Sequence, residues 1–557
     1  MQEAEVAIIG YGPVGASAAN LLGMYGCKTL VFERETVLYH LPRAAHFDDQ
    51  IMRVFQSIDL HNEIAAVTRS IGPMQFVKPN GELLFELPAG KETYGFPVIN
   101  MFYQPKLEAV LQTGVTRFPH VTVQFGCAVE AIEQDKTGAT LVVHDTVNGT
   151  WARVRVRYVL GCDGARSITR KAAGIALQDM KFEQPWLVVD TLLKEDVPLP
   201  EAAVQICDPA RPSTYVPSAR EHRRWEFMLV KGETHTEMEQ PDKIQLLLSP
   251  WVDPSKVEVV RAVVYTFHAL LAERWHDGKL LLVGDAAHQM PPFMGLGMCS
   301  GIRDAQNVCW KLSLVLQGKA DPSLLDTYQQ ERRPLVKSTI TMAIRRGRFI
   351  QAQQPVATLR NILFWLQKLV PLAMLRNLSL RLQKLVPSLS RISKRKKPSF
   401  PLAADILIGG QRHGLYSPAG TLFPQPHVRT PAGTSILFDE VLGQSFALLG
   451  YNVDPRQTLD VAALAFWEDL SASFVTVIPP EGTCTALDGD NVHVVCDVEG
   501  VIAKWFGPQD SHIAIIRPDR YVFGVCAPSV LQAATAELQA MFQGGVDQRT
   551  KASKPIK

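Results

Sequence analysis

The chain of 557 residues lacks several features that would assign it to common classes of protein. Its nine cysteines include no Cys-x-x-Cys pair, so we predict no metal site and no disulfide framework, as is typical of a reducing compartment. It has no run of 18 uninterrupted apolar residues, so we expect no stable membrane insertion. A net charge of +2 does not indicate nucleic acid as a partner. Since no basic region precedes the first apolar run, we expect no signal peptide and a cytoplasmic protein.

The first residues that carry a positive signal predict a dinucleotide-binding unit. Four β-formers lead into Gly-x-Gly-x-x-Gly at residues 10–15, and an alanine-rich helical pattern follows. A second short strand at residues 28–32 ends in Glu33. This is the order of a βαβ unit whose glycines bring the backbone close to a pyrophosphate and whose acid binds a ribose hydroxyl. The alternative is an ordinary capped helix followed by a surface glutamate.

Two further strands are predicted to end in short acidic turns. A buried strand at residues 158–161 precedes Asp163, and another at residues 279–283 precedes Asp285. An aspartate between the end of a strand and the start of a helix is well placed to contact a ligand at the mouth of a sheet. The loop at residues 291–297, rich in proline and glycine, then leads into a helix predicted over residues 300–317, whose N-terminus favours an anion. We expect His288 to pack against this turn rather than act as a base.

Residues 175–268 predict a second, mostly antiparallel β-domain that covers an aromatic substrate. Short extended segments alternate there with proline-rich loops. A β-hairpin is predicted within residues 72–99, around the turn at residues 79–81, and is expected to contribute to this domain. The candidates to line the substrate site are Arg211, Tyr215, Arg223, Arg224 and Phe227. The alternative for each is a solvated arginine or a core aromatic residue.

Taken together, the three strand-end motifs resemble those of the single-component aromatic flavoprotein hydroxylases, the para-hydroxybenzoate hydroxylase-like group. The residues on which this resemblance rests are 10–15 with Glu33, 162–167 and 284–288. Further segments look like the branch of 3-(3-hydroxyphenyl)propionate (3-hydroxycinnamate) hydroxylases: 42–44, 104–105, 207–212, 225–227, 301–305 and 326–333. Residues 420–426 and 517–521 look like the thioredoxin-like C-terminal domain of that branch.

This resemblance implies FAD as the bound cofactor, NADH or NADPH as a transient reductant, O2 as co-substrate and ortho-hydroxylation of a small phenol. No catalytic side chain is predicted, because the cofactor performs the chemistry. The implied FAD contacts are Gly10, Gly12, Pro13, Val14, Gly15, Glu33, Arg34, Arg43, Gln104, Asp163, Arg166, Gly284, Asp285, Pro292, Gly295, Gly297 and Met298. The predicted substrate contacts are Arg211, Tyr215, Phe227, Pro291 and Phe293.

The predicted fold class is α/β, with a Rossmann-like FAD-binding domain, an inserted mostly β substrate domain and a C-terminal thioredoxin-like domain. The FAD-binding domain is expected to comprise residues 1–174 and 269–350, and the substrate domain residues 175–268. A helical, basic connector (residues 351–402) and the C-terminal domain (residues 403–550) follow. Because that last domain lacks Cys-x-x-Cys, we expect it to have a structural role such as homodimerisation.

Two departures from the branch leave the substrate open. Leu296 stands between the two glycines of the 291–297 loop, where the branch usually has glutamine. The segment at residues 359–400 is longer and more basic than the usual connector. One alternative keeps the chemistry with a bulkier aromatic substrate of polyketide or quinolone type. Another, of a different class, is a flavin-binding protein with little turnover that residues 359–400 recruit to a membrane or a partner.

Overall fold

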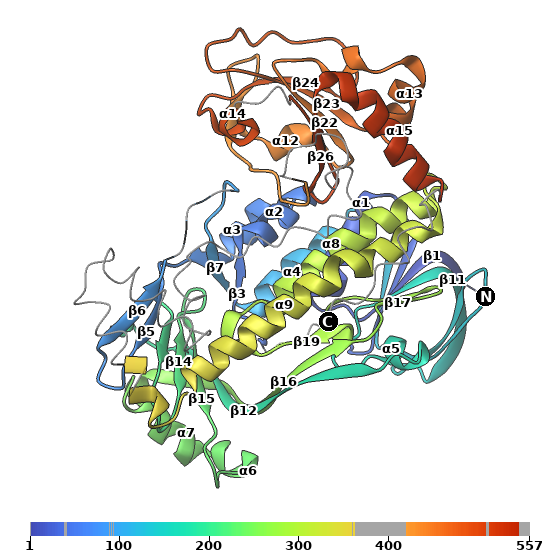
Figure 1. Cartoon of the computed structure of the whole chain (residues 1–557). Helices are drawn as coiled ribbons and strands as arrows, with labels where there is room; N and C mark the ends of the chain where they lie inside the picture. The colour runs from blue at the N-terminus through green and yellow to red at the C-terminus, as the bar shows by residue number, and fades with distance from the viewer. Residues whose placement is uncertain are drawn as a thin grey trace.

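The computed structural model describes residues 2–37, 42–88, 90, 92, 94–358, 360–361, 419–507 and 512–544. Most of the predicted connector, including nearly all of residues 359–400, and the start of the C-terminal domain at residues 403–418 lie outside the described residues. The structure is a mixed α/β fold with separate sheets (Figure 1). Within the described residues, no helix is long and apolar enough to cross a lipid bilayer.

The first sheet has at its centre the strand that precedes the glycine-rich loop. Its strands run in the order β17 (His276–Asp277), β18 (Leu280–Leu282), β11 (Thr150–Gly161), β1 (Gln2–Ile9), β2 (Thr29–Glu33) and β8 (Val121–Phe125), and β9 (Cys127–Gln134) and β10 (Ala139–Asp145) extend β11. From β18 to β8 the neighbouring strands are parallel. Parallel strands end at the same edge of a sheet, so the segments that follow β1, β2, β11 and β18 are brought together.

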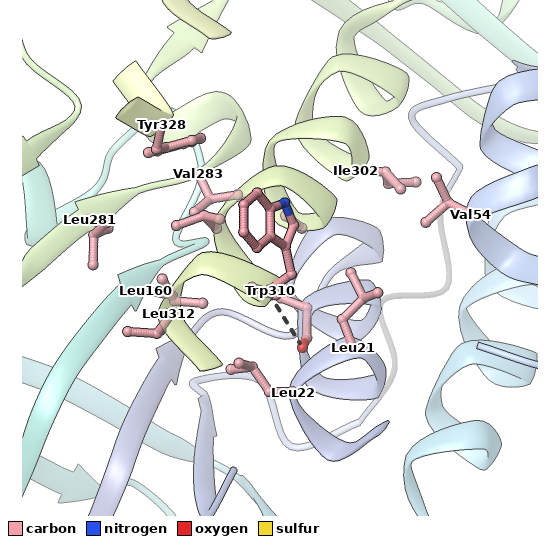
Figure 2. Close-up of a cluster of buried hydrophobic side chains, with 14 of the residues drawn as sticks. Leu21, Leu22, Val54, Leu160, Leu281, Val283, Ile302, Trp310, Leu312 and Tyr328 are labelled. Atoms are coloured by element: carbon pink, nitrogen blue, oxygen red, sulfur yellow. Dashed lines mark hydrogen bonds between the residues drawn. The ribbon is translucent and has the colours of Figure 1, made fainter. Parts of the chain in front are cut away.

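Helices α1 (Pro13–Met24) and α8 (Gly297–Leu316) pack on this sheet and form the main hydrophobic core. Figure 2 draws Leu21 and Leu22 of α1, Ile302 and Leu312 of α8, and Leu160 and Leu281 of the sheet in one cluster of buried hydrophobic side chains. All six side chains are almost fully buried. The long helix α9 (Asp326–Ile350) runs alongside α8 (Figure 1). The hydroxyl of Tyr328 in α9 donates to the carbonyl of Leu282 at 2.7 Å, which ties this helix to the end of β18.

The second sheet is mostly antiparallel. Its strands run in the order β19 (His288–Gln289), β16 (Val257–Ala272), β12 (Leu177–Leu193), β15 (His222–Met228), β14 (Ser213–Val216), β13 (Val204–Ile206), β5 (Met74–Val77) and β6 (Leu83–Leu87). Strands β5 and β6 pair as an antiparallel hairpin, as predicted from the turn at residues 79–81. Strand β5 pairs in turn with β13, so the hairpin belongs to this sheet.

Smaller elements connect these sheets. A three-stranded sheet contains β3 (His46–Asp48), β7 (Ile99–Phe102) and β4 (Thr68–Ser70). The remaining helices of this part of the chain are α2 (Asp49–Ser57), α3 (His61–Ala66), α4 (Gln104–Val115), α5 (Ile168–Ala172), α6 (His235–Met238) and α7 (Pro241–Leu248).

The C-terminal region forms a third sheet with flanking helices. Its strands run in the order β21 (Ser435–Leu437), β20 (His427–Arg429), β24 (Val492–Cys496), β23 (Ser473–Ile478), β22 (Ala447–Tyr451), β25 (Ile513–Ile516) and β26 (Val522–Cys526). Its helices are α12 (Asp439–Leu442), α13 (Val461–Asp469), α14 (Val501–Phe506) and α15 (Leu531–Phe542). Buried ion pairs attach it to the rest: Arg53 of α2 contacts Asp439 at 2.5 Å, and Arg517 contacts Glu331 of α9 at 2.8 Å.

Candidate functional site: the carboxyl edge of the first sheet

The three strand-end motifs meet at one edge, and the glycines show how closely. Gly10 has φ +91°, and a Cβ there would lie 2.5 Å from the carbonyl oxygen of Cys162. A Cβ on Gly15 would lie 2.0 Å from the carbonyl oxygen of Gly10. A Cβ on Gly284 would lie 3.3 Å from a methyl group of Val14. Gly10 and Gly284 thus bring segments more than 100 residues apart in the sequence into close contact, and at Gly10 and Gly15 a side chain does not fit.

Gly12 differs from these glycines because a Cβ there would meet nothing within 4 Å. It is the N-cap of α1, and Pro13 follows as the first helical residue. Among the described residues, no side chain caps this helix end and no acidic residue stands in its first turn. The free backbone N–H groups and the helix dipole suit a phosphate group.

Glu33 holds the glycine-rich loop from the end of β2. Its carboxylate accepts from the backbone N–H of Tyr11 at 2.7 Å and from that of Glu35 at 3.0 Å. The side chain is partly exposed, so its remaining acceptor capacity faces outward beside the loop. Arg34 is exposed and its Nε lies 3.3 Å from the Glu35 carboxylate. The structure therefore places Glu33 at the loop and Arg34 at the surface.

Asp163 lies at the same edge after β11. One carboxylate oxygen accepts from the backbone N–H and the hydroxyl of Thr169, both at 2.9 Å. The other oxygen, Oδ1, is buried and has no hydrogen-bond partner among the described residues. A buried carboxylate oxygen without a partner is costly, so it is expected to meet a donor from a ligand. Arg166, in the turn that follows, is exposed.

Arg170 was missed by the sequence analysis, yet it joins two of the motifs. Its guanidinium donates to the carbonyl of Ala165 and to that of Ala286, each at 2.9 Å. Arg170 is 7% exposed, so these bonds form inside the protein. Only its basic helical surroundings were visible in the sequence, and these do not indicate that the side chain points inward.

Asp285 follows β18 and combines two properties. Its side chain is accessible to solvent, yet enough protein surrounds the carboxyl that burial raises its pKa, against the opposing effect of His288 and Arg43. His288 itself is fully buried, and its Nε2 lies 2.6 Å from the Asp304 carboxylate. As predicted, His288 packs against the turn.

The segment around Arg43 is fixed from two sides. The amide oxygen of Gln104 accepts from the backbone N–H of Arg43 at 2.7 Å and from that of Ala44 at 2.8 Å. From the second sheet, the guanidinium of Arg224 donates to the carbonyls of Arg43 and Pro42 at 2.8 and 3.0 Å. The Arg43 side chain is exposed, and its charge partly opposes the burial that raises the pKa of Asp285. Gln104 therefore positions the segment through its backbone.

The 291–297 loop makes a tight turn before α8. Gly295 has φ +60°, and a Cβ there would overlap the ring of His46 at 1.8 Å. Pro291 and Phe293 are buried, whereas Pro292, Gly295, Gly297 and Met298 are partly accessible. The ring centroid of Phe293 lies 5.7 Å from that of Trp186 in β12 and 5.8 Å from that of Phe182. These contacts show which face of the second sheet turns toward the loop.

The register of the second sheet separates the predicted substrate contacts. Val188 of β12 pairs with Glu226 of β15, and Leu187 pairs with Phe227. Alternate residues point to opposite faces, so Trp186, Val188 and Glu226 share the face toward the loop. Tyr215 and Phe227 lie on the other face, in the hydrophobic cluster that includes Leu248 of α7. The structure therefore does not bring Tyr215 and Phe227 together with Pro291 and Phe293.

Arg211 lies in an ion pair. Its guanidinium contacts both carboxylate oxygens of Glu233, at 2.6 and 2.8 Å, and donates to the carbonyl of Met228 at 3.0 Å. The hydrogen bond from Arg211 is the main cause that lowers the pKa of Glu233 to about 2. Arg211 is therefore held by an acid and a backbone carbonyl and is not freely solvated.

The residues at this edge fit a dinucleotide that carries a flavin. Gly12 leaves open space at a helix N-terminus, Asp163 presents an unpartnered buried oxygen, and Asp285 lies accessible within surrounding protein. These features supply donors for a pyrophosphate and acceptors for sugar hydroxyls. The 291–297 loop, whose Phe293 contacts Trp186 of the second sheet, leads into the N-terminus of α8.

Comparison with known proteins agrees with this geometry. A family model described as FAD binding domain matches residues 3–343, and one described as HcaD C-terminal domain matches residues 420–541. The chain is 35% identical to the 3-(3-hydroxy-phenyl)propionate/3-hydroxycinnamic acid hydroxylase of Klebsiella pneumoniae (strain 342), over 97% of this chain and 96% of the relative. It is 36% identical to the enzyme of the same name from Mycobacterium sp. (strain KMS), over 99% and 94% of the two chains.

Solved structures show the same fold. The flavin-dependent monooxygenase PieE, in complex with FAD and substrate, superposes with a TM-score of 0.77 at 21% identity, over 97% of this chain and 99% of that one. Aklavinone-11 hydroxylase, in a ternary complex with FAD and aklavinone, also gives a TM-score of 0.77, at 20% identity over 98% and 100%. The chain belongs to the FAD-binding family of aromatic hydroxylases that includes the 3-(3-hydroxy-phenyl)propionate/3-hydroxycinnamic acid hydroxylases, and FAD is its cofactor.

Proposed function

We propose that the chain hydroxylates a phenolic acid of the 3-(3-hydroxyphenyl)propionate type, ortho to its hydroxyl group, with consumption of NADH or NADPH and O2. The observation that carries this proposal is the meeting of three motifs at one sheet edge, opposite one face of the second sheet. Near-complete alignment with hydroxylases named for this substrate supports it.

The placement of residues at the edge supports the FAD contacts that the resemblance implies. Gly10, Gly12, Pro13, Val14 and Gly15 bind the pyrophosphate, and Glu33 binds the adenosine ribose with Arg34 at the rim. Asp163, Gly284 and Asp285 bind the ribityl chain, Arg43 and Gln104 border the cofactor, and Arg166 faces the approach of the nicotinamide. Pro292, Gly295, Gly297 and Met298 line the flavin ring. Within this set, the unpartnered oxygen of Asp163 and the open space at Gly12 give the strongest support.

FAD, when bound, supplies electron transfer from the nicotinamide to O2 and delivery of one oxygen atom to the aromatic ring. The chain's own residues hold the substrate and exclude water. We assign the substrate-facing surface to the side of the second sheet that carries Trp186, Val188, Val263 and Tyr265, together with Pro291 and Phe293. Tyr215 and Phe227 then support this surface from behind, and Arg211 supports the end of β15.

The domain assignments rest on the sheet to which each strand belongs. The first sheet with α1, α8 and α9 would form the FAD-binding domain, and the second sheet the substrate domain, close to the predicted bounds at residues 174 and 268. The strand order of the third sheet supports a thioredoxin-like C-terminal domain with a structural role such as homodimerisation. All nine cysteines are free, which supports a cytoplasmic location.

A panel of phenolic acids tests the function. Purified holoenzyme is mixed with NADH or NADPH and each compound, and nicotinamide oxidation is compared with hydroxylated product. We expect tight coupling with 3-(3-hydroxyphenyl)propionate and none with 3-phenylpropionate, which lacks the hydroxyl group. Coupling only with a bulkier aromatic would change the substrate, and oxidation without product would identify an effector. If no phenol stimulates oxidation, the enzyme proposal fails.

A further inference from the structure

One carboxyl on the substrate-facing surface has no role in the contacts described so far. Glu226 lies in the middle of β15, where its register partners are Val188 of β12 and Thr214 of β14. The same face carries Trp186 and Met228 on the side toward Phe293, and Asp190 and Arg224 on the other side. Because same-face residues on one strand lie about 7 Å apart, Glu226 is one step from the residues that contact the 291–297 loop.

The surroundings of Glu226 make a purely structural role costly. No hydrogen bond or ion pair connects its carboxyl to any residue in the described part of the chain, whereas the nearby Arg224 is paired with Asp190 at 2.7 Å. The side chain is partly accessible, yet burial raises its pKa, with Arg224 opposing this effect and Asp190 adding to it. An enclosed carboxyl without a partner destabilises a protein, and such groups gather at functional sites.

We infer that Glu226 accepts the hydroxyl proton of the bound phenol and thereby prepares the ring for hydroxylation. In this step the phenolic O–H bond breaks, the proton passes to a carboxylate oxygen of Glu226, and the bonding electron pair stays on the phenolic oxygen. The step consumes no oxidant or reductant. It rests on the proposed function, since it requires a phenol on this surface.

The chemistry of the site suits this transfer. A phenol has a pKa of about 10, so a base whose own pKa is raised by its environment is better matched to it than an exposed carboxylate. Other titratable or charged side chains on this face include Arg224 on the same strand, β15, Asp190 of β12, and Arg261 and Tyr265 of β16. Oδ1 of Asp190 accepts from Arg224, and its buried Oδ2 lies 3.9 Å from the Arg261 guanidinium, whereas the carboxyl of Glu226 is partly accessible and far enough from any cation of the described residues to lack an ion pair. We therefore assign the contact with substrate to Glu226.

The experiment follows ionisation of the bound phenol without turnover. FAD-loaded wild type and Glu226→Gln are titrated with 3-(3-hydroxyphenyl)propionate in the absence of nicotinamide, and the ultraviolet difference band of the phenolate is recorded across pH. We expect the band to appear near neutral pH in the wild type. In the variant it should appear at a pH at least about one unit higher. The value of kcat should fall about 100-fold, within the range for general-base catalysis. Glu258→Gln, at an exposed position of β16, is the matched control and should behave as the wild type.

Two further results separate the possible failures. A ring-fluorinated substrate, whose phenol is more acidic, should recover most of the lost rate in Glu226→Gln, because it ionises without a strong base. If the variant gives the wild-type phenolate band and kcat, the role of Glu226 is overturned. If wild type hydroxylates the substrate without a phenolate band, the Glu226 role also fails while the proposed function stands. A wild type that oxidises no nicotinamide with any phenol contradicts the function itself.

Discussion

The carboxyl edge of the first sheet and the substrate-facing surface of the second sheet differ in what builds them. At the edge, backbone atoms approach so closely that Gly10 and Gly15 have no room for a side chain. On the second sheet, side chains form the surface, and the face on which each side chain lies depends on strand register. A constraint on backbone stereochemistry leaves a local mark in the sequence, whereas a constraint on strand register does not.

The largest expected effect separates two glycines of the edge. Gly15→Ala would place a Cβ 2.0 Å from the carbonyl oxygen of Gly10, so α1 must shift away from β1, and we expect loss of FAD and of all activity. Gly12→Ala meets no protein atom within 4 Å, so the apoprotein should keep its melting temperature. Its FAD affinity should fall at least about tenfold, or about 1.4 kcal/mol, because the new methyl group occupies the space of the pyrophosphate. The measurements are the thermal melting of apoprotein and FAD titration by fluorescence.

An apoprotein of Gly12→Ala that melts lower but binds FAD normally would contradict this division. It would show that Gly12 serves the packing of α1 in the way that Gly15 does.

The second prediction tests the face assignment on neighbouring residues of one strand. Phe227→Ala removes a buried ring from the cluster behind the sheet, and we expect the free energy of unfolding to fall by about 3–5 kcal/mol. At a temperature where the variant stays folded, KM for the phenolic acid and product per NADH should match the wild type. Met228→Ala, on the face that carries Trp186, is the matched comparison and should reduce coupling. Equal effects of both variants on coupling would overturn the assignment.

What could be predicted from the sequence depends on this same difference between backbone constraints and strand register. The three motifs, the parallel strands that carry them and the hairpin of β5 and β6 were all predicted, because glycines, strand-end acids and turn residues are local signals. Tyr215 and Phe227 were chosen for their aromatic character, but aromatic residues are equally common in cores. Only the pairing of Leu187 with Phe227 settles the face, and this pairing spans 40 residues of sequence.

Buried arginines were also not predictable from the sequence. Arg170 and Arg224 each bind backbone carbonyls from distant segments, and both are at most 7% exposed. Arginine is usually found at the surface, so composition and periodicity favour a solvated side chain. Strand β12 runs from Leu177 to Leu193 with Pro185 inside it, although proline usually disfavours the interior of a strand.

The third prediction concerns the segment at residues 42–44, which both regions contact. Glu108 of α4 accepts from the side-chain amide of Gln104 at 2.5 Å, and Gln104 in turn holds the backbone of Arg43 and Ala44. Burial raises the pKa of Glu108 from 4.5 to about 7, although the Gln104 hydrogen bond and Arg43 oppose the shift. The folded protein therefore binds this proton more tightly than the unfolded chain. The stability that it contributes is fully present below pH 4.5 and is lost as pH rises through 7.

Glu108→Gln keeps an acceptor for Gln104 but cannot titrate. We expect the difference in unfolding free energy between wild type and variant to change by about 3 kcal/mol from pH 4.5 to pH 8, with the wild type losing stability. Denaturant unfolding at both pH values measures this difference, and Glu63→Gln, at an exposed position of α3, is the control. Parallel pH dependence in all three proteins would mean that Glu108 does not titrate in this window. If FAD affinity falls with the ionisation of Glu108, the edge depends on a segment that the second sheet also holds through Arg224. The two regions would then act together at Arg43.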